Sequence, residues 1–322
     1  MKTFKTTLFL ALLFMATTAF GQKTIEKTFS GVEDIRLSVA SGSIVVKKAS
    51  GSDVKVTLEY NYDDDDYEAE FDQSGSRLRM GEEFKNRRNW NNRGRSEWTL
   101  EIPDGMSLDM NTGSGNIEVL NVEADILASS GSGRVEVEGI KGYSRLTTGS
   151  GSISAEDMEG ELKVNTGSGA IRVRDINGDS DLNTGSGSIR VNNATGGMQY
   201  NTGSGSIDAI NVSITDHSRF NTGSGSIDVV LSAALDSDVS LNTGSGSATL
   251  DFNGQTIEGK FTLEASGKNN ISAPFKFDKE YEEEGGRGWR GRDKRYIKEA
   301  EIGSKNIHID ISTGSGSARV KK

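Results

Sequence analysis

Two short segments combine arginine, glycine and tryptophan, the residue types best suited to holding an anionic or sugar-bearing ligand. Residues 85–95 carry five basic side chains and no acid, and residues 287–295 carry five basic side chains and one acid. Arginine makes forked contacts with anionic groups, and tryptophan packs against ring faces. The expected ligand contacts are Arg87, Arg88, Trp90, Arg93, Arg95, Trp289, Arg290 and Arg292.

The alternative for both segments is that they are solvated loops. Acidic runs lie nearby in the sequence at 62–68 and 281–284, and the basic side chains can pair with these runs in the same molecule. A third tryptophan, Trp98, stands in the strand-like stretch SEWTLEI and is expected to plug the open end of a buried core.

Catalytic and metal-binding patterns are weak elsewhere. His217 and His308 have no HExxH motif and no cysteine partner, so we predict no zinc site and no cofactor. The serines occur mostly in a repeated motif without a GxSxG elbow, whereas an active site needs one singular environment. We therefore predict a protein that is not an enzyme. Asp208 and Asp228 are the closest approach to paired acids, and they keep open a polysaccharide-active enzyme.

Calcium has two candidate positions. An aspartate follows the glycine-rich motif at Asp208 and Asp228, but arginines Arg172 and Arg190 occupy the same position in other copies, which argues against a calcium-binding repeat. The acidic run 63–66 is either a loose site for one Ca²⁺ or a charged loop.

An internal repeat dominates the chain. The motif NTGSGSI recurs word for word at 183–189, 201–207 and 221–227, and related Thr/Ser-Gly-Ser-Gly corners extend the pattern in both directions. The corners begin at Thr112, Ser130, Thr148, Thr166, Thr184, Thr202, Thr222, Thr243 and Thr313, with steps of 18 residues from the first to the sixth. Eighteen residues are too few for a strand and a crossover helix. The repeat therefore predicts an all-β fold, a single-stranded parallel β-helix (β-solenoid) of about 18 residues per coil.

Within each coil, apolar residues mark the buried positions. Counting from Ile117, the first, third, sixth and twelfth positions are apolar, as in Ile117, Val119, Val122 and Ala128, and we expect them to stack in ladders. The corner glycines are expected to supply backbone angles that a Cβ resists. The longer steps of 20 and 21 residues predict small loops on the opposite turn.

The regular repeat divides the chain. We expect a signal peptide at 1–21, irregular coils at 22–110, regular solenoid repeats at 111–252 and further coils with the second Arg/Trp insert at 253–322. Lys2 and Lys5 precede a short apolar run that ends in small residues, which predicts export to the periplasm, the outer surface or the medium with no membrane-spanning segment after cleavage. The chain has no cysteine, so no disulfide bond can form. Its net charge of -10 argues against nucleic-acid binding.

Together, the signal peptide, the irregular start that ends in IPDG at 102–105 and the many NTGSGSI coils resemble the bacterial "putative adhesin" family of β-strand-repeat proteins. The resemblance covers the chain from about residue 25 onward. It implies a right-handed parallel β-helix without catalytic residues and an adhesin-like role with envelope or cell-surface glycans or proteins as partners. An envelope-stress regulatory component is a further alternative; the oligomeric state stays open.

Overall fold

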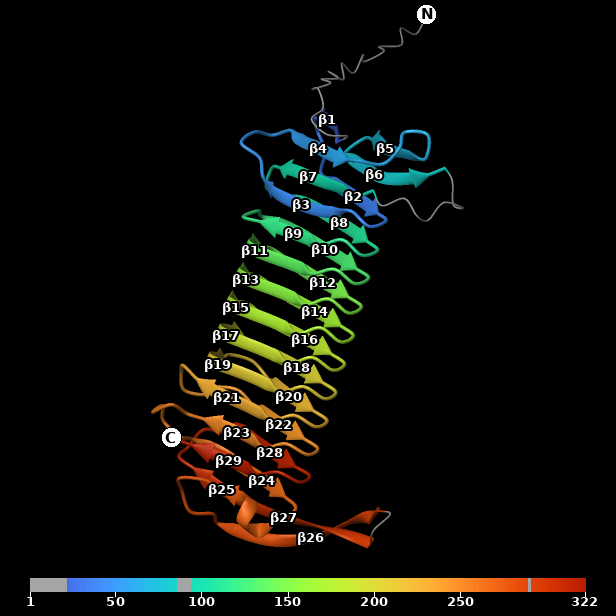
Figure 1. Ribbon diagram of the computed structural model, residues 1–322. Helices are drawn as coiled ribbons and strands as arrows, with labels where there is room; N and C mark the ends of the chain where they lie inside the picture. The colour runs from blue at the N-terminus through green and yellow to red at the C-terminus, as the bar shows by residue number, and fades with distance from the viewer. Residues whose placement is uncertain (1–21, 86–93, 289–290) are drawn as a thin grey trace, which may run out of the picture.

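The strands of this protein form two sheets that face each other along one long axis. The computed structural model describes residues 22–85, 94–288 and 291–322, without the side chains of 284–293. One sheet has 14 strands and the other has 15. Their strands stack one above another into an elongated column, with the N-terminal strands at one end and β26 and β27 at the other (Figure 1). The predicted all-β solenoid of repeated strands is confirmed.

The middle of the column is built from parallel strands that alternate between the two sheets. Each coil adds one strand to the 14-stranded sheet and the next strand to the 15-stranded sheet. The stem strands are β8 (Met106–Thr112), β9 (Ile117–Leu120), β10 (Ala124–Ser130), β11 (Val135–Lys141), β12 (Ser144–Thr148), β13 (Ile153–Glu159), β14 (Leu162–Thr166), β15 (Ile171–Asn177), β16 (Ser180–Thr184), β17 (Ile189–Gly196), β18 (Met198–Thr202), β19 (Ile207–Ile214), β20 (Ser218–Thr222), β21 (Ile227–Leu231), β22 (Val239–Thr243) and β23 (Ala248–Asp251).

Register in the stem places equivalent residues of successive coils opposite each other. Ile153 pairs with Val135 on one side and Ile171 on the other, and Ile171 in turn pairs with Ile189. Ladders of this kind fill the interior, and the predicted first, third, sixth and twelfth positions are buried, as at Ile117, Val119, Val122 and Ala128. Each coil covers apolar surface that its neighbour cannot bury alone, so the core is one continuous cluster.

The structure corrects the reason for glycine at the repeated corner. Among the described residues, the glycines with positive φ lie outside the Thr/Ser-Gly-Ser-Gly corners. The corner glycines are required because successive corners touch. A Cβ on Gly203 would lie 2.4 Å from the carbonyl oxygen of Gly185, and one on Gly205 would lie 1.9 Å from that of Gly187. The backbones of adjacent coils therefore meet without room for a side chain.

Left-handed backbone occurs instead at a turn within the strands of the 14-stranded sheet. Six residues with φ between 53° and 66° occupy one position in successive coils: Asn121, Gly139, Asp157, Asp175, Asn193 and Asn211. Asparagine, aspartate and glycine are the residue types that tolerate this conformation. The local sequence thus explains a bend that carries the chain from one sheet toward the other.

The irregular steps fall where they were predicted. The 20-residue step adds residues between β19 and β20, and the 21-residue step adds residues between β21 and β22. Both connections run from the 14-stranded to the 15-stranded sheet, whereas the glycine corner makes the return connection. The insertions therefore lie on the turn opposite the corner.

Antiparallel strands close both ends of the column. The N-terminal part contains β1 (Lys23–Phe29), β2 (Asp34–Val39), β3 (Ser43–Lys48), β4 (Val54–Tyr60), β5 (Tyr67–Ser74), β6 (Arg77–Phe84) and β7 (Ser96–Ile102). The C-terminal part contains β24 (Gly259–Ala265), a 3₁₀ turn (Lys268–Asn270), β25 (Ile271–Ser272), β26 (Lys279–Gly288), β27 (Gly291–Ile302), β28 (His308–Thr313) and β29 (Ala318–Lys321).

The two caps join the stem in different ways. At the C-terminal end, β28 inserts between β22 and β24, so the ninth corner stacks directly on the eighth. At the N-terminal end, β3 lies between β7 and β9. Trp98 in β7 is fully buried there and packs on Phe71 with ring centroids 5.5 Å apart, as expected of a core plug.

Candidate binding groove

A shallow groove runs along the outer face of the 15-stranded sheet, beside the glycine corners. It has a volume of about 420 Å³ and crosses five successive coils, from β12 to β20. Threonine, asparagine and glycine are the residue types that line it: Thr147, Thr148, Asn165, Thr166, Gly167, Asn183, Thr184, Gly185, Asn201, Thr202, Gly203, Asn221, Thr222 and Gly223. We call this surface the asparagine groove.

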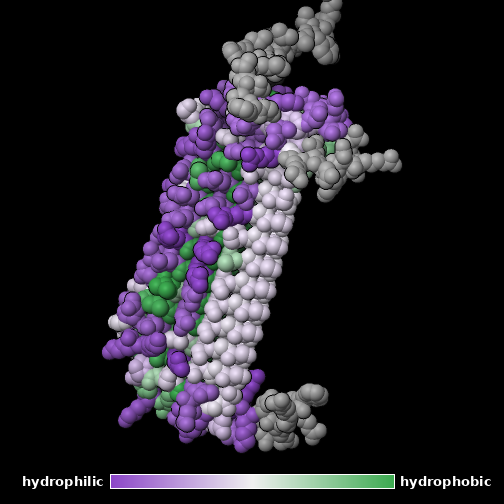
Figure 2. Space-filling view, in the orientation of Figure 1, coloured by the Kyte–Doolittle hydropathy of each residue, from purple (hydrophilic) through white to green (hydrophobic). Residues whose placement is uncertain are grey.

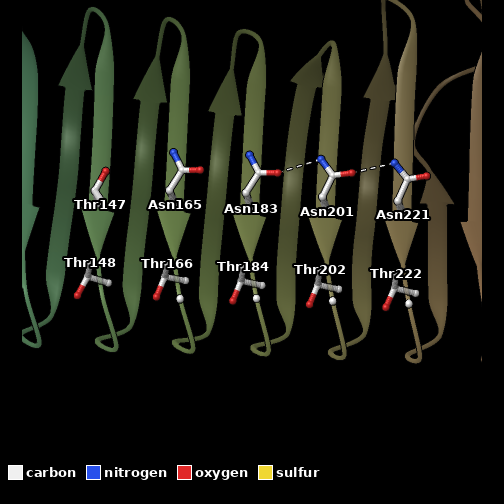
Figure 3. Close-up of a pocket in the computed structure, with 14 residues that line it drawn as sticks. Thr147, Thr148, Asn165, Thr166, Asn183, Thr184, Asn201, Thr202, Asn221 and Thr222 are labelled. Atoms are coloured by element: carbon white, nitrogen blue, oxygen red, sulfur yellow. Dashed lines mark hydrogen bonds between the residues drawn. The ribbon is translucent and has the colours of Figure 1, made fainter.

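The asparagines of the groove form a ladder along the column (Figure 3). The Nδ2 group of Asn201 donates to Oδ1 of Asn183 at 3.0 Å, and that of Asn221 donates to Oδ1 of Asn201 at 2.8 Å. Beyond the groove, Asn242 extends the ladder with a 3.1 Å hydrogen bond to Asn221. These amides point outward and are half-buried, so each one keeps hydrogen-bonding capacity that a ligand can use.

The threonines beside the ladder have a structural role. Thr184 and Thr202 are buried, and their hydroxyl groups bond to backbone atoms of two coils. The groups that a ligand can reach in the groove are therefore mainly the asparagine amides, of which Asn165 is the most exposed, and the exposed backbone at Gly203. Such a surface can donate to and accept from hydroxyl groups, and it presents similar contacts at each step of about 4.8 Å between strands.

Alongside this surface stands a smooth edge made of the corners. Figure 2 shows it as a pale stripe of small residues along the length of the column. The corners contribute exposed serines to this edge, namely Ser186, Ser204 and Ser224. The stripe leaves the asparagine groove open on that side.

Most of the predicted ligand contacts lie outside the described residues. This applies to Arg87, Arg88, Trp90, Arg93, Trp289 and Arg290, and to the side chain of Arg292. Arg95 is described and exposed, and its backbone nitrogen donates to Oδ1 of Asn61 at 2.7 Å. Its contact with a ligand stays a prediction.

Two lysines of the Arg/Trp segments that the structure describes pair with acids of the same chain. Lys85 lies 2.7 Å from Glu68, and Lys294 lies 2.6 Å from Glu282. These pairs agree with the solvated-loop alternative at the flanks. The flanking strands β6 and β27 belong to opposite ends of the column (Figure 1).

The paired acids are neighbours but do not share a groove. Asp208 and Asp228 are register partners on β19 and β21. Asp208 lies 3.5 Å from Arg190, and both side chains are on the outer face of the 14-stranded sheet, away from the asparagine groove.

The other titratable candidates are dispersed. His217 is exposed in the connection between β19 and β20, whereas His308 begins β28 and lies 3.7 Å from Asp238. In the run 63–66, the carboxylate of Asp64 lies 2.7 Å from Lys23, and this hydrogen bond lowers the pKa of Asp64. Across the described ranges, no group of three or more His, Cys, Asp or Glu side chains is placed to hold a metal ion.

The sequence analysis did not predict the asparagine groove, although the repeat indicates it. Asn183, Asn201 and Asn221 occupy one repeat position, directly after the buried Leu182, Tyr200 and Phe220. In a parallel solenoid, an outward side chain at a fixed position must stack on its own copies.

Comparisons with known proteins identify a family and several similar solved structures. The family model described as Toastrack DUF4097 matches residues 32–275. Among solved structures, one named "putative lipid binding protein" from Parabacteroides distasonis is 15% identical, with 94% of this chain and 98% of that chain covered and a TM-score of 0.44. A "putative adhesin" from Bacteroides fragilis is 12% identical, with 92% and 97% covered and a TM-score of 0.36. No curated protein matches the chain.

The described residues hold no helix that is long and apolar enough to cross a membrane. The family model spans about three-quarters of the 322 residues, including both the N-terminal cap strands from Val32 onward and the whole stem. The repeated coils, the two-sheet column and this match together show that the chain belongs to the Toastrack DUF4097 family of β-repeat proteins, which resembles the adhesin-like family inferred from its corners.

Proposed function

We propose that this chain is an exported, non-enzymatic binding protein of the bacterial envelope or surface, and that the asparagine groove holds an extended polar polymer such as an envelope glycan. The observation that carries the proposal is the amide ladder. Its asparagines recur in four successive coils, from Asn165 to Asn221, so a linear chain of sugars can meet similar donors and acceptors along this part of the groove.

Rigidity supports the same role. The asparagine side chains are held by one another, and the strands beneath them are packed on a continuous core. A ligand therefore meets donors and acceptors that are already ordered, and little conformational entropy is lost when it binds. We also propose that the solenoid is right-handed, as crossover connections between parallel strands are.

Export rests on residues 1–21, which lie outside the described part of the chain. The test is fractionation of the native host with antibody to the mature chain, followed by N-terminal sequencing. The expected product begins at Gln22 and occurs in the envelope or the medium. A chain that retains Met1 in the cytoplasm would contradict this part of the proposal.

Binding is tested with the mature chain and purified envelope glycans in isothermal titration. The variant N201A/N221A removes two rungs of the ladder, and N177A is a matched control because Asn177 is exposed on the other sheet. We expect N201A/N221A to weaken binding about ten-fold or more and N177A to leave it unchanged, since each lost hydrogen bond contributes about 1 kcal/mol. Equal affinity of all three proteins would reject the groove as the binding surface.

The Arg/Trp segments and the enzyme alternative are tested in the same series. Variants in which glycine and serine replace 86–93 or 289–292 show whether either end adds affinity. The non-enzymatic part predicts that no reducing or unsaturated sugar ends appear when the glycans are incubated with the protein. Their release, with loss of release in D208N, would establish the polysaccharide-active alternative instead.

A further inference from the structure

A second groove lies on the outer face of the 14-stranded sheet, away from the asparagine groove. It has a volume of about 340 Å³, and three of its lining side chains are arginines from two adjacent strands. Arg172 and Arg174 project from β15, and Arg190 projects from β17. Ser154 and Asn192 add polar side chains to the same groove, and the carboxylates of Glu156 and Asp208 also line it. We call this surface the arginine groove.

Two of these arginines form an unfavourable pair. Arg172 and Arg190 are register partners on parallel strands, which lie about 4.8 Å apart. Like charges directly opposite each other destabilise a sheet. The pair is thus costly unless negative charge lies close to both guanidinium groups.

The acids of the protein neutralise this pair only in part. Arg174 is satisfied by Glu156, with Nη1 and Oε1 2.7 Å apart. Arg190 makes a longer contact of 3.5 Å between Nε and Asp208, which leaves its two terminal nitrogens available. Within the described ranges, Arg172 has no acid within ion-pair distance. Its side chain is exposed and lines the groove.

The surrounding surface limits the size of a ligand. Glu136 and Glu138 occupy the equivalent outward positions one coil before Ser154, and Asp208 and Asp228 follow the arginines. A long polyanion that ran along the column would meet carboxylates on both sides of the arginines. A compact anion centred between Arg172 and Arg190 meets only Glu156 and Asp208, which pair with Arg174 and Arg190.

We propose that the arginine groove binds a single phosphate group, held between Arg172 and Arg190. A phosphate carries about two negative charges near neutral pH, and the planar fork of arginine matches its oxygens with two parallel hydrogen bonds. The Ser154 hydroxyl and the Asn192 amide supply further donors at the edges of the groove. The site is independent of the asparagine groove and does not depend on the function proposed for it.

The experiment measures binding of inorganic phosphate and of glucose 6-phosphate to the mature chain at constant ionic strength. The variants are R172Q and R172K/R190K, and R219Q is the control because Arg219 is an exposed arginine whose register partners, Gln199 and Ser240, are neutral. We expect R172Q to lose about ten-fold in affinity, R172K/R190K to keep the charge but lose much of the affinity, and R219Q to bind as the wild type does.

Melting temperatures provide a second test of the same site. Without phosphate, R172Q should melt at the same temperature as the wild type or higher, because the like-charge pair is relieved. Phosphate should raise the melting temperature of the wild type and of R219Q but not that of R172Q. An affinity of R172Q within two-fold of the wild type, or an equal loss in R219Q, would overturn the proposal.

Vesicles of phosphatidylcholine with phosphatidic acid distinguish the sources of the phosphate. Binding of both the vesicles and glucose 6-phosphate, each sensitive to R172Q, would support the site with a lipid headgroup as a source. Binding of glucose 6-phosphate alone would support it with a sugar phosphate as the source. Binding of the vesicles alone would overturn the proposal of a compact site.

Discussion

The hydroxyl group of Thr202 joins two coils. It donates to the carbonyl oxygen of Gly187 in the preceding coil at 2.8 Å, and it accepts from the backbone nitrogen of Gly205 in its own corner at 3.1 Å. The same two bonds recur along the stem, for example at Thr184 with Gly169 and Gly187. The corner hydroxyl group, from threonine or from Ser130, thus satisfies two backbone groups where a strand ladder is interrupted.

Replacement of Thr202 by valine should destabilise the stem by about 1–3 kcal/mol, because it leaves a donor and an acceptor without partners in a part of the structure that water does not reach easily. Thr202→Ser keeps the hydroxyl group and should cost much less. Thermal unfolding followed by circular dichroism measures both variants. Faster hydrogen exchange of the Gly205 amide in the valine variant would place the loss at the corner, and equal melting temperatures would contradict this role.

Gly205→Ala should be more damaging than Gly→Ala substitutions usually are. The new Cβ would lie 1.9 Å from the carbonyl oxygen of Gly187, and both atoms are held by the backbone. We expect a loss of about 3 kcal/mol or more, since a rigid core yields little to added atoms. Ser204→Ala, one residue away and exposed, is the control and should unfold like the wild type. A small effect of G205A would show that the coils can separate at the corner.

The period of the sequence made the stem predictable, because equivalent residues of a stacked repeat must lie on one another. It hid one buried position, however. The tenth residue of the coil reads Ile126, Ser144, Leu162, Ser180 and Met198, and all five are buried. The mixture of serine and apolar residues conceals this ladder. The role of the corner glycines was also misread, since composition cannot distinguish a positive φ from a close backbone contact.

The caps were less predictable because their pairings are long-range and have no period. Lys27 faces Val56 in an antiparallel pair, and Phe261 faces Ala300 in another. Nothing local in the sequence sets these registers. The arginine groove, in contrast, follows from the period: Arg172 and Arg190 are 18 residues apart at one repeat position, so the register of the stem places them opposite each other.

Alkaline pH should destabilise the protein in part through Tyr200. This residue is fully buried, and burial raises the pKa of its phenol, while the 2.9 Å hydrogen bond with Ser180 offsets part of that effect. A group whose pKa is raised on folding keeps its proton in the folded state after the unfolded chain has lost it. The contribution of Tyr200 to stability should therefore be constant below about pH 10 and fall by up to about 1.4 kcal/mol per pH unit above it.

Tyr200→Phe removes this contribution. The variant should be about 1 kcal/mol less stable at pH 7, because Ser180 loses its partner, but its stability should fall less steeply above pH 10. Part of the slope remains, since burial also raises the pKa of Tyr67. Denaturation midpoints between pH 8 and pH 11 measure the slopes. Identical slopes for the two proteins would show that Tyr200 does not govern the alkaline limit.

The N-terminal cap should depend on the carboxylate of Glu82. Its Oε1 atom accepts from the Trp98 indole at 3.1 Å, from the Tyr67 hydroxyl at 3.2 Å and from the Ser96 hydroxyl, while Oε2 accepts from the backbone nitrogen of Ala40 at 2.9 Å. In Glu82→Gln an NH2 group, which is a donor, replaces one of the two carboxylate oxygens. This NH2 group must face either the Ala40 amide or the other three donors. We expect a loss of about 1–3 kcal/mol that is confined to the cap.

Two measurements locate that effect. Tryptophan fluorescence should shift as Trp98 is exposed at a lower denaturant concentration than in the wild type, and amides of β6 and β7 should exchange faster while those of β14 and β16 do not. Glu83→Gln is the matched control, because Glu83 is exposed on the same strand. Each coil contacts only its neighbours, so a loss confined to the cap is expected when the coils are weakly coupled. A uniform loss along the whole column would contradict this expectation and would mean that the cap and the stem unfold as one unit.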